Sequence, residues 1–175
     1  MNQPQNWPSQ YPPEVSNFYG NPVGADGQES QVWVHEYIIQ VPCVYPMVWD
    51  LDPPDRGKPV PYMRVNKKCA DSLVRCFQAI LAAYPNQNDR EKFHLNWWGG
   101  CFNFRAMQGG HSLSVHSYGI AIDLAPTWNQ QHKPYDPATM LPMNVVNIFE
   151  AEGWVWGGRW SAASIDCMHF QAAHL

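Results

Sequence analysis

Two short stretches in the C-terminal half of the chain bring acidic and histidine side chains close together. "SVHSYGIAIDL" contains His116 and Asp123, and "DCMHF" contains Asp166 and His169. Imidazole nitrogens and carboxylate oxygens are zinc ligands, and three such protein ligands leave a fourth position open for water. We therefore predict a catalytic zinc site on His116, Asp123 and His169. Asp166 is then the spare carboxylate that takes a proton from the water.

The first stretch also has a simpler interpretation. His116 can be a surface or hydrogen-bonded histidine, and Asp123 can cap a turn before Pro126, because a motif has meaning only in its structural context. The second acid–imidazole pair, on another β-prone segment, favours the metal site. The other histidines lack such a partner and are interpreted as surface or hydrogen-bonded residues: His35, His94, His132 and His174. His111 is a weaker candidate for a substrate contact.

The elements that would position these side chains are short strands. Alternation in "YGIAIDLAP" places Asp123 on one face with two small residues, Gly119 and Ala121, which leave space for a ligand. The isoleucines and Leu124 lie on the other face. Alternation also predicts a strand over residues 99–107, with Arg105 on the face away from the phenylalanines. A last short strand is expected around residues 165–171.

Helical periodicity appears in two places. Apolar residues at spacings of three and four predict a helix from Val65 to Tyr84, ended by Pro85. A second helix is expected over residues 142–152, between Pro142 and Gly153. Residues 32–49 are β-prone but interrupted by prolines, which indicates an edge strand or an irregular segment. We predict an α+β fold, in which a small, mainly antiparallel sheet has helices packed on one side and carries the zinc site.

The domain organisation is read from composition. Residues 1–30 are rich in Pro, Gln, Asn and Gly, and we predict an extended arm that is ordered only where an aromatic side chain docks. Residues 31–175 are predicted to form one domain, which suits the length of the chain. The five cysteines include no C-x-x-C pair, and Cys69 and Cys76 lie ~10 Å apart along a helix, so free thiols are expected.

Composition and charge exclude some classes of function. The formal net charge is −4 and only 15% of residues are charged, so a nucleic-acid-binding surface is not expected. No apolar run approaches the ~20 residues of a membrane span. The N-terminus lacks the basic start and apolar core of a secretory signal, so we expect synthesis in the cytoplasm without such a signal. A monomer is expected.

The two motifs resemble a known family. Ser114-Val-His116-Ser-Tyr-Gly119-Ile-Ala121-Ile-Asp123 is similar to the S-x-H-x-x-G-x-A-x-D signature of the VanY-like D-alanyl-D-alanine carboxypeptidases. "GWVWGGRW" followed by "DCMHF" resembles the second signature, an aromatic-glycine loop before a D/E-x-x-H motif. "FNFRAM" is similar to the arginine-bearing strand of the family. The resemblance covers about residues 60–171, and the family includes phage endolysins that cut the L-alanyl-D-glutamate bond.

The resemblance implies a role for each matched residue. One zinc ion would bind to His116, Asp123 and His169, with Asp166 as general base and then as acid toward the leaving amine. Arg105 would polarise the scissile carbonyl and stabilise the oxyanion. Ser114, Trp156 and Trp160 would line the substrate site. Arg159 and Gln171 depart from the pattern, because relatives often have an acid at each position.

These implications lead to a zinc-dependent peptidoglycan peptidase acting on stem peptides, and the L-Ala–D-Glu endopeptidase of phage lysins is the first candidate. A D-Ala–D-Ala carboxypeptidase is the second. A zinc-stabilised cell-wall-binding module without turnover is the candidate from another class, and an intact Asp166 and Arg105 speak against it. The enzyme would act on the cell wall after release through a phage-made membrane lesion.

Overall fold

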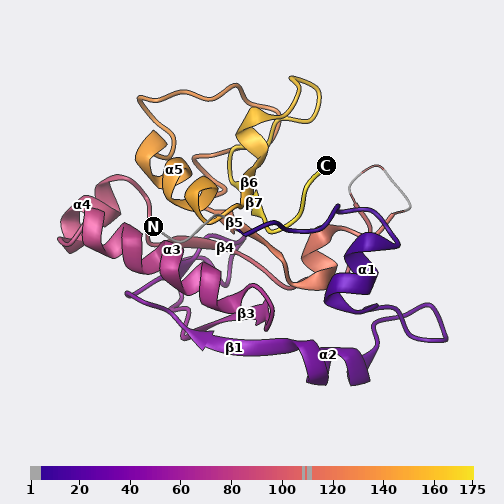
Figure 1. Ribbon diagram of the computed structural model, residues 1–175. Coiled ribbons are helices and arrows are strands. Elements are labelled where there is room, and N and C mark those ends of the chain that lie inside the picture. Colours follow the sequence, from indigo (N-terminus) through magenta and orange to yellow (C-terminus); the bar gives the residue numbers. More distant parts are fainter. Residues whose placement is uncertain (1–4, 108, 110–111) are drawn as a thin grey trace.

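The computed structural model of the protein describes residues 5–107, 109 and 112–175. Its fold is α+β, as predicted, with a five-stranded sheet at the centre (Figure 1). The strands lie in the order β2 (Val48–Trp49), β4 (Trp97–Gly100), β5 (Ala121–Leu124), β7 (His169–Gln171) and β6 (Val155–Trp156). Only β2 and β4 pair in parallel, so the prediction of a mainly antiparallel sheet is confirmed.

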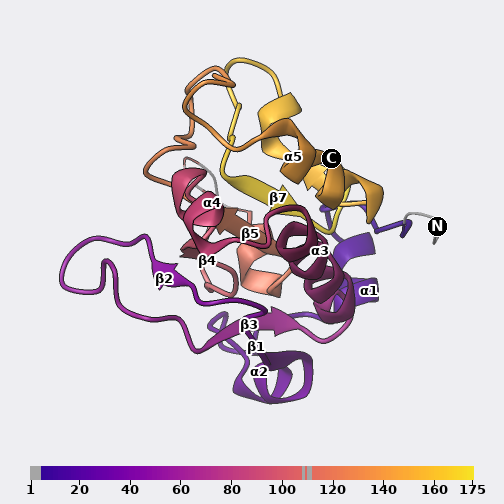
Figure 2. The ribbon, with the colours of Figure 1, turned by 90° about the vertical axis from the view of Figure 1, so that its left-hand side faces the viewer.

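Two helices cover the same side of this sheet. Figure 2 shows α3 (Ala70–Ala83) and α5 (Met143–Ala151) in front of the strands. Phe77 on α3 makes edge contacts with Trp98 and Phe149, and Phe149 stacks on Phe170 with ring centroids 4.3 Å apart. This aromatic layer fixes β5 and β7 against the helices, because interiors are packed closely. Within the described residues, no helix is long and apolar enough to cross a membrane.

The segment before α3 departs from expectation. Residues Gln31–Tyr37 form a helix, α2, and only Ile38–Pro42 form a strand, β1, which pairs antiparallel with β3 (Tyr62–Asn66). The Ser30 side chain caps α2 by accepting a hydrogen bond from the Trp33 N–H, 3.3 Å away. An N-terminal serine cap of this kind outweighs the β-propensity of the two valines that follow. The long helix begins later than predicted, because Val65 belongs to β3.

The N-terminal segment is anchored beside the C-terminus. Its helix α1 (Glu14–Tyr19) buries Tyr19, whose hydroxyl donates a hydrogen bond to the Ala172 carbonyl, 2.7 Å away. The backbone N–H of Gln10 donates to the His174 carbonyl at 2.7 Å. Trp7 is also buried, whereas Tyr11 and Phe18 stay 51% and 37% exposed. The segment therefore lies next to β7, while the boundary at residue 30 remains a prediction from composition.

The remaining short elements are α4 (Gln87–Lys92) and two 3-10 turns, η1 (Val115–Tyr118) and η2 (Gly157–Arg159). The predicted strand over residues 99–107 is wrong beyond Gly100. Gly100 takes a φ of 125°, and the chain then leaves the sheet as an irregular segment. All five cysteine thiols are free, as expected.

Candidate metal centre

The register of two neighbouring strands brings Asp123 and His169 together. In the β5–β7 pair, Asp123 lies directly opposite His169, and Ala121 lies opposite Gln171. Side chains at directly opposed positions point to the same face and come within contact distance. The other face carries Ile122 and Phe170, which are fully buried in the core. The alternation read from the sequence therefore holds for the strand that carries Asp123.

His116 reaches the same face from the turn η1, which ends where β5 approaches. Ser114 caps this turn, since its hydroxyl accepts a hydrogen bond from the His116 N–H at 3.3 Å. Gly119 ends it in the left-handed conformation, with a φ of 65°. A Cβ at Gly119 would also stand 2.6 Å from Ile38 Cδ1, which explains why the motif needs glycine here. Gly119 is therefore a turn residue and not part of the strand.

Three ligand atoms converge. His116, Asp123 and His169 each offer one atom, and these atoms lie within 4.8 Å of one another. His116 Nε2 is 3.4 Å from Asp123 Oδ2, and His169 Nδ1 is 3.2 Å from Asp123 Oδ1. His116 Nε2 is buried and has no hydrogen-bond partner. A buried nitrogen without a partner, facing a carboxylate and a second imidazole, fits a divalent cation between them.

The tautomer of each imidazole is set by an acceptor on its far side. His116 Nδ1 lies 2.7 Å from the Cys101 carbonyl, and His169 Nε2 lies 3.0 Å from Gln171 Oε1. Both acceptors lack a hydrogen to donate, so each takes the imidazole N–H and leaves the opposite nitrogen free to bind a metal. Such outer partners orient metal-binding histidines in general. They were not identified from the sequence.

The charges at the centre suit a cation. Burial by itself raises the pKa of Asp123, but the charges and hydrogen bonds of His116 and His169 outweigh burial and hold this pKa below its ordinary value. Burial lowers the pKa of His169, yet its hydrogen bond and charge interaction with Asp123 raise it overall. Asp123 is therefore ionised at neutral pH and available as an anionic ligand.

Asp166 lies at the edge of the same centre as a buried carboxyl group. Burial raises its pKa to about 6, although the charge of His169 opposes the shift. Its Oδ1 atom is buried and has no hydrogen-bond partner. A carboxylate with a pKa near neutrality is suited to accept and return a proton.

The aromatic-glycine loop holds Asp166 in place. The Asp166 N–H donates to the Gly157 carbonyl at 3.0 Å, and a Cβ at Gly157 would stand 2.5 Å from the Asp166 carbonyl oxygen. A Cβ at Gly158 would meet the Trp156 ring at 2.1 Å. The two glycines of "WGGRW" are therefore required by close approach, and the loop packs against the backbone of Asp166.

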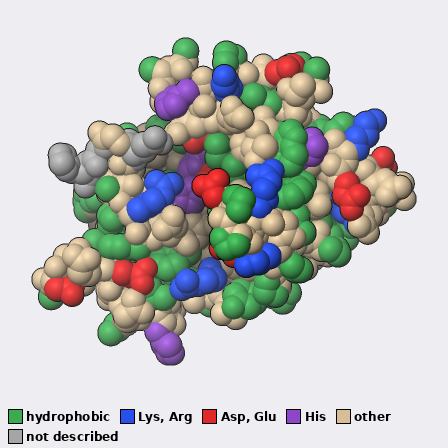
Figure 3. All heavy atoms as spheres, turned by 180° about the vertical axis from the view of Figure 1, so that it is seen from behind, with side chains coloured by type: hydrophobic (Ala, Val, Ile, Leu, Met, Phe, Trp, Pro, Cys, Tyr) green, Lys and Arg blue, Asp and Glu red, His purple; other side chains and the backbone are tan. Residues whose placement is uncertain are grey.

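A cavity of about 730 Å³ opens over the metal centre. Its walls include the three ligands and Asp166, together with Arg105, Ser114 and Trp160. Figure 3 shows histidine side chains inside a hollow of this face, between basic and acidic side chains. The structure thus brings together seven of the eight residues predicted for the site.

Residues 108–172 match a family model described as D-alanyl-D-alanine carboxypeptidase. This match confirms the family resemblance over the segment that carries both motifs. Neither curated proteins nor solved structures gave a match. The matched segment contains the His-Asp-His centre and the aromatic-glycine loop. Together they support a zinc metallopeptidase of the D-alanyl-D-alanine carboxypeptidase type.

Arg105 lies before the matched segment and reaches the cavity from an irregular strand-like stretch. Its backbone is tied to the turn that carries His116. The Arg105 N–H donates to Ser117 Oγ at 2.9 Å, and Ser117 Oγ donates to the Arg105 carbonyl at 2.8 Å. Ser114 N–H also donates to that carbonyl, at 3.0 Å. Arg105 is exposed, so its guanidinium is available to a ligand in the cavity.

Trp156 is the predicted site residue that the structure places elsewhere. It is 3% exposed, packs in the core beside Phe170, and donates its indole N–H to the Cys167 carbonyl at 2.9 Å. Strand β6 turns this side chain to the core face, and Gly158 lets the chain fold over the ring. Trp160, four residues later, instead lies against His169 with ring centroids 5.3 Å apart.

The two departures from the family pattern have different surroundings. Arg159 forms an ion pair with Glu150 on α5 and does not line the cavity among the described residues. Gln171 is fully buried and accepts from His169. Further cavity residues missed by sequence reasoning are Gln10, Tyr11, Gln131 and His132. His111, the weaker candidate, lies outside the described residues.

Proposed function

We propose that the protein is a zinc-dependent peptidoglycan peptidase that hydrolyses the L-Ala–D-Glu bond of stem peptides, as phage lysins do. The convergence of His116, Asp123 and His169 below an open cavity, with Asp166 beside them, carries the proposal. An ordered cleft with a buried carboxyl group of raised pKa is typical of a catalytic site. A binding module without turnover would have no use for that group.

The roles proposed for the residues follow from their positions. A bound zinc ion would supply Lewis acidity to the peptide carbonyl and to the attacking water. Asp166 would accept the proton of that water and return it to the leaving nitrogen. Arg105 would donate hydrogen bonds to the carbonyl oxygen as negative charge develops there. Ser114 and Trp160 would contact the substrate in the cavity.

The shape of the cleft supports cleavage within a chain. The cavity over the metal centre shares the side chains of Gln10, Tyr11, Met107 and Val115 with a second cavity of about 290 Å³. The second cavity therefore lies next to the cavity over the metal centre. An endopeptidase needs room for substrate on both sides of the bond, and the second cavity offers such room.

The second candidate is a D-Ala–D-Ala carboxypeptidase, and the description of the matched family favours it. In this case Arg105 would bind the terminal carboxylate of the substrate, because Arg binds carboxylates in a bidentate manner. Arg105 is the only Lys or Arg among the described residues that line the cavity. Arg105 would then bind the substrate carboxylate in the carboxypeptidase, whereas in the endopeptidase it would stabilise the oxyanion.

Mass spectrometry of fragments released from purified cell walls distinguishes the two. New D-glutamate amino termini support the endopeptidase, and free D-alanine supports the carboxypeptidase. Release of neither product by the zinc-loaded protein would refute both. EDTA should abolish the release and zinc should restore it.

Asp166→Ala is the matched control variant. It is expected to bind zinc but to release no fragment, because it keeps the three ligands and loses the proton acceptor. Cleavage by Asp166→Ala at the wild-type rate would contradict the role proposed for Asp166. Zinc content measured on the same samples separates loss of the base from loss of the metal.

A further inference from the structure

The side chain of Gln171 connects a metal-site histidine to the N-terminal segment. Its Oε1 lies 3.0 Å from His169 Nε2. Its Nε2 donates to the Ala173 carbonyl at 3.0 Å and to Gln10 Oε1 at 2.9 Å. Gln171 is fully buried, and Gln10 is half-buried. All three polar contacts of the amide are therefore made inside the protein.

The pattern of donors and acceptors leaves one orientation for the Gln171 amide. The Ala173 carbonyl can only accept, so the NH₂ end of the amide must face it. The oxygen end then faces His169, and since an amide oxygen only accepts, His169 must carry its hydrogen on Nε2. The lone pair of the neutral ring is consequently on Nδ1, which points toward Asp123.

Gln10 has a specific task in this chain of contacts. A carboxylate at position 171 would present an oxygen to His169 in either rotamer. An amide has an NH₂ end that must be kept away from the imidazole N–H. Two acceptors, the Ala173 carbonyl and Gln10 Oε1, hold this NH₂ end more firmly than one acceptor would. Gln10 supplies the second acceptor from outside residues 108–172, the segment that matches the family.

We propose that Gln10 is a positioning residue of the metal centre, which acts through Gln171 to hold His169 in the Nδ1-binding tautomer. The N-terminal segment is then part of the active site. The side chain of Gln10 does not need to hold the segment in place, because its backbone N–H is already bonded to the His174 carbonyl at 2.7 Å. This proposal rests on the proposed zinc site.

Zinc affinity of the full chain, measured by competition with a chromogenic chelator, tests the proposal. Loss of an outer partner of a metal-binding histidine costs about 10–100-fold in affinity. Gln171→Leu should reach that range, and Gln10→Leu should weaken zinc about 3–10-fold, because the Ala173 carbonyl still holds the amide. Gln10→Glu keeps an acceptor and should stay within about twofold of wild type. Gln40→Leu, on exposed β1, is the matched control.

A second measurement separates positioning from general stability. Nitrogen-15 spectra of the zinc-loaded protein report the Nε2–H of His169, and Gln10→Leu should speed the exchange of this hydrogen with solvent because its acceptor, Gln171 Oε1, is held less firmly. An unchanged zinc affinity and an unchanged exchange rate of the His169 Nε2–H in Gln10→Leu, with only a lower melting temperature, would overturn the proposal. Wild-type protein that binds no zinc would instead refute the proposed function.

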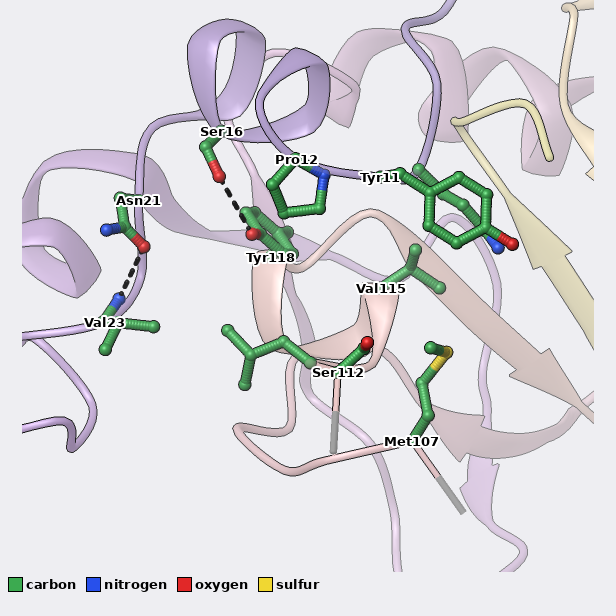
Figure 4. A pocket seen from close by; sticks show the side chains of 11 residues that line it. Tyr11, Pro12, Ser16, Asn21, Val23, Met107, Ser112, Val115 and Tyr118 are labelled. Carbon is green, nitrogen blue, oxygen red and sulfur yellow. Dashed lines mark hydrogen bonds between the residues drawn. The ribbon is translucent and has the colours of Figure 1, made fainter. Parts of the chain in front are cut away.

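A different observation concerns the second cavity. Tyr11 and Pro12 of the N-terminal segment face Met107 and Val115 across it, and Ser16 Oγ and Tyr118 Oη lie 3.1 Å apart at one wall (Figure 4). The walls are mainly apolar, and no Asp, Glu, Lys or Arg lines it among the described residues. A charged group would lose its hydration there without gaining a partner.

We infer that this cavity is a substrate subsite for an uncharged, mainly apolar portion of the peptide, next to the bond held at the metal centre. Tyr11 and Val115 line both this cavity and the one over the metal centre, and this adjacency supports a single bound chain. The inference rests on the proposed peptidase activity. The glutamate side chain and any terminal carboxylate of the substrate would then lie in the other cavity, near Arg105.

Val23 lines the second cavity and is absent from the lining of the first. Val23→Phe should therefore fill the subsite alone. We expect kcat/KM to fall about tenfold on a stem pentapeptide, which corresponds to about 1.4 kcal/mol of transition-state stabilisation. On the dipeptide that contains the cleaved bond, kcat/KM should fall less than twofold. Val32→Phe, at a position 79% exposed, is the control. Equal effects on the two substrates would overturn the inference, whereas no cleavage of either by wild type would refute the function.

Discussion

Asp166→Asn should make the zinc-free protein more stable at neutral pH while abolishing activity of the zinc-loaded protein. The side chain is buried, its Oδ1 has no partner, and burial raises its pKa from 3.8 to about 6. A folded-state pKa above the unfolded value means that folding disfavours the ionised form. The penalty is complete above about pH 6 and is lost as the pH falls toward 4.

The magnitude follows from the pKa difference. About two pKa units at 1.36 kcal/mol each give a penalty of about 3 kcal/mol at pH 7.5. Asparagine removes the ionisation but buries an amide in its place, so the expected gain in unfolding free energy is about 1–3 kcal/mol. At pH 4 the aspartate is protonated in the folded state, and the two proteins should differ little.

Urea unfolding in EDTA at pH 4, 5, 6 and 7.5 measures this difference. Asp52→Asn, on an exposed loop, removes one negative charge in the same way and is the matched control. Asp123 and His169 titrate in both the variant and the wild type, so their contribution largely cancels. A difference that does not change with pH, or an asparagine variant less stable than wild type at pH 7.5, would refute the reasoning.

Four further predictions concern the enzyme. Arg105→Ala should lower kcat about 10²–10³-fold in a cleavage assay without changing zinc affinity, because Arg105 is not a ligand. Gly157→Ala should reduce the unfolding free energy by about 1–3 kcal/mol, measured by urea unfolding, since its Cβ would stand 2.5 Å from the Asp166 carbonyl oxygen. Tyr19→Phe should lose about 1 kcal/mol by the same measurement, because its hydrogen bond to Ala172 is removed. In a pH–rate profile, kcat/KM should fall as the pH drops through about 6 or lower, where Asp166 is protonated and bound zinc favours the ionised form.

Sequence reasoning predicted the three residues that converge at the candidate metal centre because these residues follow local rules. Alternation along β5 indicated which face Asp123 occupies, although Gly119, which was assigned to the strand, belongs to the turn before it. The pairing of Asp123 with His169 was not predictable in the same way, since register between strands distant in the chain depends on the whole fold. The residue types of the two acid–imidazole pairs suggested the link between the motifs, and the family resemblance supported it.

The errors have local physical causes. Val32 and Val34 suggested a strand, although Ser30 stood at the right place to cap a helix. Trp156 was assigned to the substrate site, together with Trp160, on the family resemblance. The two tryptophans have different surroundings, because β6 directs Trp156 into the core and the turn η2 then separates it from Trp160, which lines the cavity. Gln171 was read as a departure from the family, and its partner Gln10 lies 161 residues away.

The two metal-site histidines use opposite nitrogens, and this difference explains how one carboxylate serves both. His116 is held at Nδ1 by a backbone carbonyl and His169 at Nε2 by a side-chain amide, so the free nitrogens face the two oxygens of Asp123. Two neutral imidazoles and one carboxylate leave a bound divalent cation with a net charge of +1. A charged acceptor at position 171 would reduce that charge further. Gln171 orients His169 without adding negative charge, so the Lewis acidity of a bound cation is kept.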